Sequence, residues 1–130
     1  MNGELSAPPG LCIRQTERRG RGVFAARPFA VGEVIERAPV LVIPRAQVAA
    51  LRGTLLDSYW FWWDEEHNAC ALGCGSLYNH DCPANAAFAR DIAVAAIVFT
   101  AVRAIAIGEE ITINYGGAPD DPASVWFDLV

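Results

Sequence analysis

Two polar segments of this 130-residue sequence carry side chains that could bind a ligand and position a reacting group. Residues 75–85 read GSLYNHDCPAN, in which an asparagine amide can donate and accept hydrogen bonds at once. Residues 108–115 read GEEITINY and end in Tyr115. A third segment, GRGVFA at residues 20–25, holds two glycines that would let the backbone approach a ligand closely.

Each of these features has an ordinary structural explanation when it is taken alone. A single G-x-G is common in hairpin turns. Asn79 and His80 would suit an Asx-type turn, and Tyr115 could be a core residue that ends a strand. Glu109 and Glu110 are most simply surface charges or local caps, so we expect no acid or base role for them. The three segments together, in this order, form a pattern that is far more specific than any one of them.

Together the segments resemble the SET domain of protein-lysine methyltransferases, from about residue 18 to residue 115. The resemblance implies a mainly β SET-domain fold, with one short helix and small curved sheets around a knot-like core. In that core the Asn-His segment and the last strand are threaded together. We expect a single SET domain over residues 1–130, with residues 116–130 forming a C-terminal tail.

The resemblance also implies S-adenosylmethionine as the cofactor and a lysine ε-amine as the methyl acceptor. Tyr115 matches the catalytic tyrosine, whose hydroxyl would orient the amine without acting as a strong base. Trp126 lies where relatives often carry an aromatic residue over the adenine, although it could simply dock the tail. The residues expected to bind the cofactor are Gly20, Arg21, Gly22, Asn79, His80, Tyr115 and Trp126.

Lysine must lose its proton before it attacks, and a dry aromatic channel favours the neutral amine. We expect Tyr59, Phe61 and Tyr78 to line such a channel together with Tyr115. For Tyr59 and Phe61 a packing role is at least as good an explanation, because aromatic strands mostly serve the core.

Two alternatives to an enzyme stay open. Asp81 stands where the family usually has serine, and Pro83 and Ala84 reverse the usual order before Asn85, which suits a catalytically silent SET-like module that binds a peptide or partner. A small zinc-stabilised domain is the other alternative, built on some of Cys70, Cys74, Cys82, His67 and His80. The cysteine spacing matches zinc sites poorly, so we expect no metal.

Composition and charge limit the partners. The net charge of −5 argues against direct binding to nucleic acid and favours a basic, lysine-bearing protein or peptide. We expect no secretory signal at the N-terminus and no membrane span, because the apolar run at residues 92–107 is short and is broken by Thr100 and Arg103. Four cysteines without an export signal favour the cytoplasm or another reducing compartment. A homodimer surface is a further hypothesis.

Eleven glycines, eight prolines and a 53% hydrophobic content favour a turn-rich, strand-rich protein. The helix predicted at residues 44–52 places Val48, Leu51 and Leu55 on one face. The aromatic run at residues 59–63 predicts a strand buried on both sides, and Pro39 is expected at an edge or bend between two strands. Strands are predicted at residues 12–15, 23–26, 34–37, 40–43, 59–63, 69–72, 86–89, 93–101 and 111–114, with a hairpin turn at Arg90 and Asp91.

Overall fold

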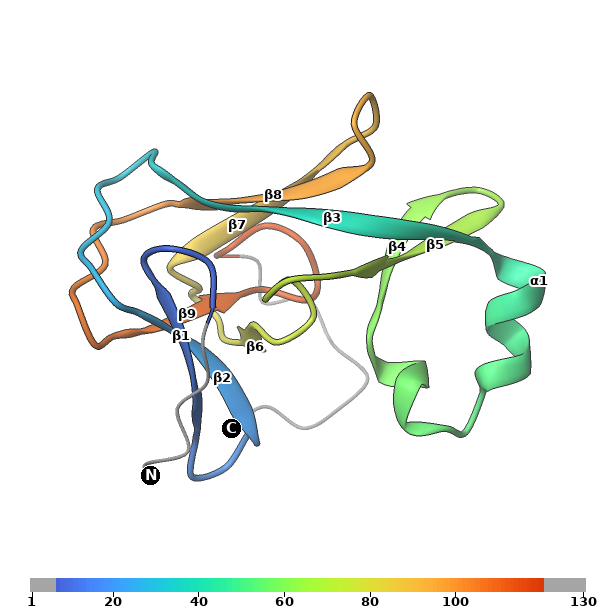
Figure 1. Ribbon diagram of the computed structural model, residues 1–130, viewed down its shortest axis with the longest axis horizontal. Helices are drawn as coiled ribbons and strands as arrows, with labels where there is room; N and C mark the ends of the chain where they lie inside the picture. The colour runs from blue at the N-terminus through green and yellow to red at the C-terminus, as the bar shows by residue number, and fades with distance from the viewer. Residues whose placement is uncertain (1–6, 121–130) are drawn as a thin grey trace.

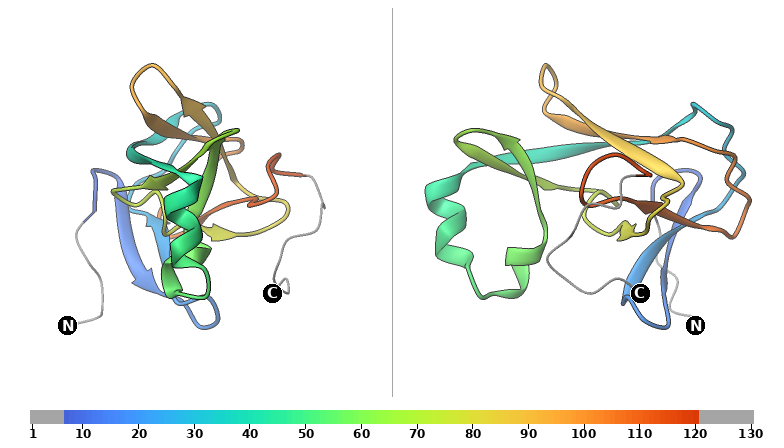
Figure 2. Two further views of the ribbon diagram at one scale, coloured as in Figure 1. Left: turned by 90° about the vertical axis from the view of Figure 1, so that its right-hand side faces the viewer. Right: turned by 180° about the vertical axis from the view of Figure 1, so that it is seen from behind.

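The computed structural model describes residues 7–120, which form two curved sheets and a short helical segment (Figure 1). Figure 2 shows the helical segment at one end of the molecule, beyond the ends of β4 and β5. The prediction of a mainly β fold with one short α-helix is confirmed. The first sheet has the order β1 (Leu11–Gln15), β2 (Arg21–Ala25), β9 (Glu110–Ile113) and β6 (Asn79–His80); the second has the order β4 (Trp60–Asp64), β5 (His67–Ala71), β3 (Val34–Pro44), β8 (Ala96–Ala101) and β7 (Ala86–Asp91).

Strand β3 runs without a break through Pro39, so the prediction of two strands split at this proline was wrong. The first half of β3 pairs with β8 as far as Pro39 and Ala96, and the second half pairs with β5 from Val40 onward. Pro39 therefore sits where the strand changes partners. The carbonyl of Pro39 accepts from the N–H of Leu72, and the change of partner falls at the one residue of β3 before Pro44 that has no N–H to donate.

The two-residue strand β6 lies parallel to β9, with Asn79 opposite Thr112 and His80 opposite Ile113. The chain after β6 continues along β9, since the N–H of Asp81 donates to the carbonyl of Ile113. A little further on, the N–H of Ala84 donates to the carbonyl of Pro119. The Asn-His segment is thus held between β9 and the chain that follows β9, as expected for a threaded core.

The helix is shorter than predicted: α1 (Arg45–Val48) gives way to 3₁₀ turns η1 (Ala49–Leu51) and η2 (Leu55–Ser58). Within the predicted apolar face only Val48 is buried, and Leu55 is 80% exposed. The helical segment ends at Arg52, which is extended, and Gly53 follows with a φ of +81°, so Leu55 begins a separate turn and no longer shares a face with Val48.

The aromatic strand β4 is not buried on both sides, contrary to prediction. Trp63 is buried and Phe61 packs against the core, but the side chain of Trp62 is largely exposed. The physical reason is that side chains alternate along a strand, so Trp62 lies on the opposite face of β4 from Phe61 and Trp63, which pack with the core. The ring of Trp62 is covered instead by guanidinium groups, with Arg90 at 4.7 Å and Arg45 at 5.9 Å from its centroid.

The β7–β8 hairpin is present, but its turn follows Asp91 instead of including it. Asp91 pairs with Ala96, so the turn residues include Ile92 and Val94, both of them exposed. The apolar run at residues 92–107 therefore contributes strand β8 and the loops on either side of it. Among residues 7–120, no helix is long and apolar enough to cross a membrane. All four cysteines lie among the described residues, and none of them forms a disulfide.

Candidate active site

The site forms where β6 meets the end of β9. The main-chain N–H of Tyr115 donates to Nδ1 of His80 over 3.0 Å, and the two rings meet edge to face at 5.3 Å. The hydroxyl of Tyr115 donates to the main-chain carbonyl of Tyr78 over 2.6 Å. Three residues that the sequence separates by up to 37 positions are thereby brought into direct contact.

Asn79 is fixed by a carboxylate and by the backbone of β2. Its Nδ2 donates to Oε2 of Glu110 over 2.7 Å and to the carbonyl of Arg21 over 3.2 Å. Gly22 makes this arrangement fit, because a Cβ at that position would lie 2.8 Å from Nδ2 of Asn79 and would overlap the Glu110 carboxylate. Both amide hydrogens are used inside the fold, which leaves Oδ1 as the atom that Asn79 could offer to a ligand.

The other two residues of the glycine segment contribute through the backbone. Gly20 has a φ of +68° and open space where a Cβ would point, so its conformation already requires glycine. Arg21 supplies its carbonyl to Asn79. The arginine whose side chain reaches β6 is Arg19, which donates from Nη1 to the carbonyl of His80 over 2.8 Å. No pattern in the sequence distinguished Arg19 from its neighbours.

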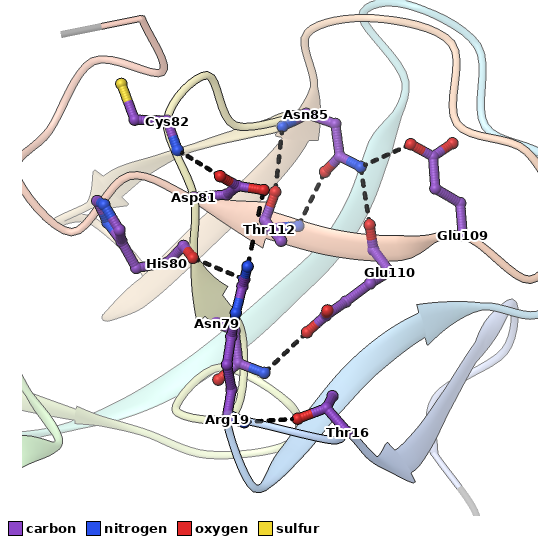
Figure 3. A network of polar contacts seen from close by, with 10 residues as sticks. All are labelled: Thr16, Arg19, Asn79, His80, Asp81, Cys82, Asn85, Glu109, Glu110 and Thr112. Atoms are coloured by element: carbon purple, nitrogen blue, oxygen red, sulfur yellow. Dashed lines mark hydrogen bonds and ion pairs between the residues drawn. The ribbon is translucent and has the colours of Figure 1, made fainter. Parts of the chain in front are cut away.

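A second asparagine, Asn85, ties the threaded segment to β9 (Figure 3). Its Nδ2 donates to the carbonyl of Glu110 over 2.8 Å and to Oε2 of Glu109 over 3.3 Å, and its Oδ1 accepts from the N–H of Thr112 over 2.8 Å. Glu109 and Glu110 are thus structural partners of the two asparagines. The prediction of surface charges or local caps missed these long-range contacts, although Glu109 does also cap the N–H of Ala106.

The residues that depart from the family pattern close the loop locally. Oδ1 of Asp81 accepts from the N–H of Cys82 over 2.8 Å, and Oδ2 lies 4.0 Å from Arg19 (Figure 3). Ala84 is buried and its N–H is paired with Pro119. The loop therefore keeps Asn79 and Asn85 against β9 despite the changed residues.

A cavity of about 510 Å³ opens beside Tyr115, and the three residues expected to line a channel all border it. Tyr59 follows η2 and comes directly before β4, Phe61 lies in β4, and Tyr78 comes from the loop before β6. Tyr78 presents little of itself to solvent, being 1% exposed. The remaining lining residues were not predicted: Ser58, Trp60, Trp62, Gly75, Ser76, Phe88, Ala89, Arg90 and Ile97.

The two titratable side chains at the centre of the site, Tyr115 and His80, are both uncharged at neutral pH. Burial above all, with the neighbouring Tyr59, raises the pKa of Tyr115 to about 12, so its hydroxyl keeps its proton at neutral pH. Burial lowers the pKa of His80, and Arg19 adds to this effect while Asp81 opposes it. A neutral ring agrees with the acceptor role of Nδ1.

Two further sequence predictions concern Trp126 and a zinc site. Trp126 lies outside the described residues. Within the described range, no group of three or more histidine, cysteine or acidic side chains is arranged to hold a metal ion. The cysteines and histidines considered for zinc are therefore not clustered there.

Comparison with known proteins identifies the fold. The family model described as the SET domain matches residues 20–116. The chain belongs to the SET-domain family. A curated relative from Schizosaccharomyces pombe, the histone-lysine N-methyltransferase specific for H3 lysine-37, is 36% identical over 119 residues, which cover 91% of this chain and 77% of the relative.

A solved structure agrees with this assignment. The crystal structure of a candidate histone methyltransferase from Plasmodium falciparum matches with a TM-score of 0.61 and 26% identity, over 83% of this chain and 98% of that one. The predicted SET-domain fold is confirmed, and so is the predicted function class, protein-lysine methylation.

Proposed function

We propose that this SET-domain chain transfers a methyl group from S-adenosylmethionine to a lysine ε-amine of a protein, with Tyr115 as the catalytic residue. The observation that carries the proposal is the position of Tyr115, whose hydroxyl lies at the edge of an aromatic cavity while its backbone is held by the Asn-His strand. The motif tyrosine and the predicted channel residues therefore meet at one place.

The residues around β2 and β6 fit the proposed cofactor. Asn79 has Oδ1 left to accept from an ammonium group, and the space beside Gly20 is open. We assign cofactor binding to Gly20, Arg21, Gly22, Asn79, His80 and Tyr115, with Arg19 holding the strand that carries two of them. When bound, S-adenosylmethionine supplies an activated methyl group on a sulfonium.

The chain itself contributes positioning and desolvation. The Tyr115 hydroxyl donates a hydrogen bond to the Tyr78 carbonyl, so it would meet the amine as an acceptor through Oη and thereby orient it. Tyr59, Phe61 and Tyr115 give the cavity apolar walls, which disfavour an ammonium ion and so favour the neutral, nucleophilic amine. With a pKa of about 12 the Tyr115 phenol stays protonated at neutral pH and does not serve as a general base, so the amine proton is left to solvent.

A radiolabelled methyl-transfer assay tests the proposal. All ten basic residues of the chain are arginine, so self-methylation on lysine side chains cannot contribute to the signal. We expect wild-type protein to label basic proteins and the Tyr115→Phe variant to lose at least about tenfold in rate while it stays folded, with a loss of stability limited to the hydrogen bond to Tyr78. Equal labelling by the two proteins would remove the role of the hydroxyl.

Histone H3 is the first substrate to test, because the fission-yeast relative is named for lysine 37 of that protein. An H3 peptide and the same peptide with that lysine replaced by arginine form the matched pair. Calorimetric titration with S-adenosylmethionine separates the enzyme from the silent module, since an enzyme must bind the cofactor. Light scattering tests the proposed homodimer.

A further inference from the structure

Glu36 is a carboxylate on the core-facing side of β3. It is 7% exposed and shares its face with Ala38 and Val40. The register of β3 against β8 shifts between Val34 and Glu36, so Ile35 and Glu36 are both buried although they are adjacent in a strand. Irregularities of this kind turn individual side chains toward a different face, and here one turns an acidic side chain inward.

Both oxygens of Glu36 receive hydrogen bonds from the segment that leads to β6. Oε1 accepts from the hydroxyl of Tyr78 over 2.7 Å, and Oε2 accepts from the N–H of Cys74 over 3.0 Å. Gly73 permits this approach, because its φ is +62° and a Cβ there would lie 2.5 Å from Oε2. The carboxylate therefore fixes both ends of the segment from Cys74 to Tyr78.

The same segment forms part of the active site. Gly75, Ser76 and Tyr78 border the cavity, and the main-chain carbonyl of Tyr78 accepts from the hydroxyl of Tyr115. The Tyr78 ring is stacked on Phe99 with centroids 4.3 Å apart. Ring and hydroxyl are thus both anchored, which leaves the Tyr78 carbonyl little freedom to move.

We propose that Glu36 is a positioning residue for the methyl transfer, acting through Tyr78 on the hydroxyl of Tyr115. The inference rests on the proposed function. Glu36 does not border the cavity and would not touch substrate. Glu36 holds in place the Tyr78 carbonyl, which accepts the hydrogen bond from the Tyr115 hydroxyl, and the cavity wall beside it. A small displacement of groups that position a substrate lowers the reaction rate strongly.

The first test is a pair of chemically matched substitutions. Glu36→Gln replaces one of two acceptor oxygens by a donor, so either Cys74 or Tyr78 loses its present partner. Glu33→Gln is the control, because Glu33 is an exposed carboxylate bonded to Arg27 and to the N–H of Ala30. We expect Glu36→Gln to lower kcat about tenfold with little change in the KM for either substrate, and Glu33→Gln to leave both constants unchanged.

A double-mutant cycle separates positioning from general loss of structure. If Glu36 acts through the hydroxyl of Tyr115, adding Glu36→Gln to Tyr115→Phe should cost less than about twofold more in kcat. An equal fold-loss in both backgrounds would overturn the inference. Should Glu36→Gln fail to fold, Tyr78→Phe replaces it in the cycle, because it removes only the hydroxyl and keeps the ring stacked on Phe99.

A measurement without catalysis makes the inference independent of the proposed reaction. The chain has three tyrosines, so ¹³Cζ labelling gives three signals to follow against pH. We expect Glu36→Gln to shift the Tyr115 signal and lower the pKa of its phenol, and Glu33→Gln to leave both unchanged. An unmoved Tyr115 signal in folded Glu36→Gln would overturn the inference. A moved signal in a protein that transfers no methyl would support the positioning and defeat only the proposed reaction.

Discussion

The main-chain N–H of Tyr115 and the ring of His80 form a hydrogen bond that exists only while Nδ1 of the histidine carries no proton. The bond joins the last residue of one motif to the Asn-His pair of the other. It therefore links the position of the proposed catalytic residue to the protonation state of a histidine.

We predict that the active site tolerates mildly acidic pH. Burial lowers the pKa of His80, so the folded protein keeps the neutral ring at pH values where a free histidine, with a pKa of about 6.5, is protonated. The unfolded chain takes up the proton first. Stability from this group is therefore complete above about pH 6.5 and is lost as the pH falls through the lower pKa of the folded state.

Histidine NMR and denaturant unfolding across this pH range check the prediction. His80 should titrate below the ordinary value, and a His80→Gln variant should show a smaller loss of unfolding free energy on acidification than the wild type. Titration of His80 at or above about 6.5 would contradict it.

Replacing Gly22 by alanine should weaken cofactor binding. The added Cβ would lie 2.8 Å from Nδ2 of Asn79 and would overlap Glu110, so the amide must move and its Oδ1 loses its direction. We expect the affinity for S-adenosylmethionine to fall at least about tenfold by calorimetry. Gly53→Ala is the control, because it strains a residue at φ +81° in open space and should cost about 1 kcal/mol of stability without changing affinity. Equal affinities for Gly22→Ala and wild type would contradict the prediction.

Asn85 should be a major contributor to stability. It is 2% exposed and makes hydrogen bonds to Glu110 and Thr112 of β9, so Asn85→Ala leaves buried polar groups without partners. We predict a loss of about 3 kcal/mol in the free energy of unfolding. Asn68→Ala removes one weak bond to Phe61 at 3.5 Å and should cost less than about 1 kcal/mol. Similar losses of unfolding free energy in the two variants would contradict a major contribution of the Asn85 amide to stability.

Cys74 should be unreactive in the folded protein. Burial, with the charge of Glu36, raises the pKa of its thiol to about 12, so almost no thiolate forms at pH 8. We expect iodoacetamide to modify the half-buried Cys70 and Cys82 under native conditions and to spare Cys74 until the protein is unfolded. Peptide mass spectrometry at several times reports each site, and early modification of Cys74 would contradict the prediction.

The fold and the residues that meet at the site could be predicted from the sequence, because the motifs resemble those of a family in which these segments lie together. Asn79, His80 and Tyr115 lie as the resemblance implied. The sequence did not reveal the carboxylates that hold them. A glutamate pair after a glycine is typical of an exposed turn, and only the folded chain shows that Glu110 faces the amide of Asn79 across 31 residues.

Errors in the predicted elements have local causes. Pro39 was expected to split a strand, but β3 changes partners at that residue and needs no N–H there. Trp62 was expected inside the protein, but it lies on the face of β4 opposite to Phe61 and Trp63, which pack with the core. The burial of Glu36 depends on a register shift, which alternation of polar and apolar residues in the sequence cannot show.

The parallel pairing of β6 with β9 has a consequence for synthesis on the ribosome. A nascent chain that has emerged only as far as β8 contains the Asn-His pair but not the strand on which it lies. Residues 79–85 then have no β9 to pair with, and their amide groups stay hydrated until β9 leaves the exit tunnel. Assembly of the proposed site therefore follows the synthesis of β9, and a polypeptide that stops before residue 110 would contain the three β-hairpins β1–β2, β4–β5 and β7–β8 but not the strand that pairs with the Asn-His segment.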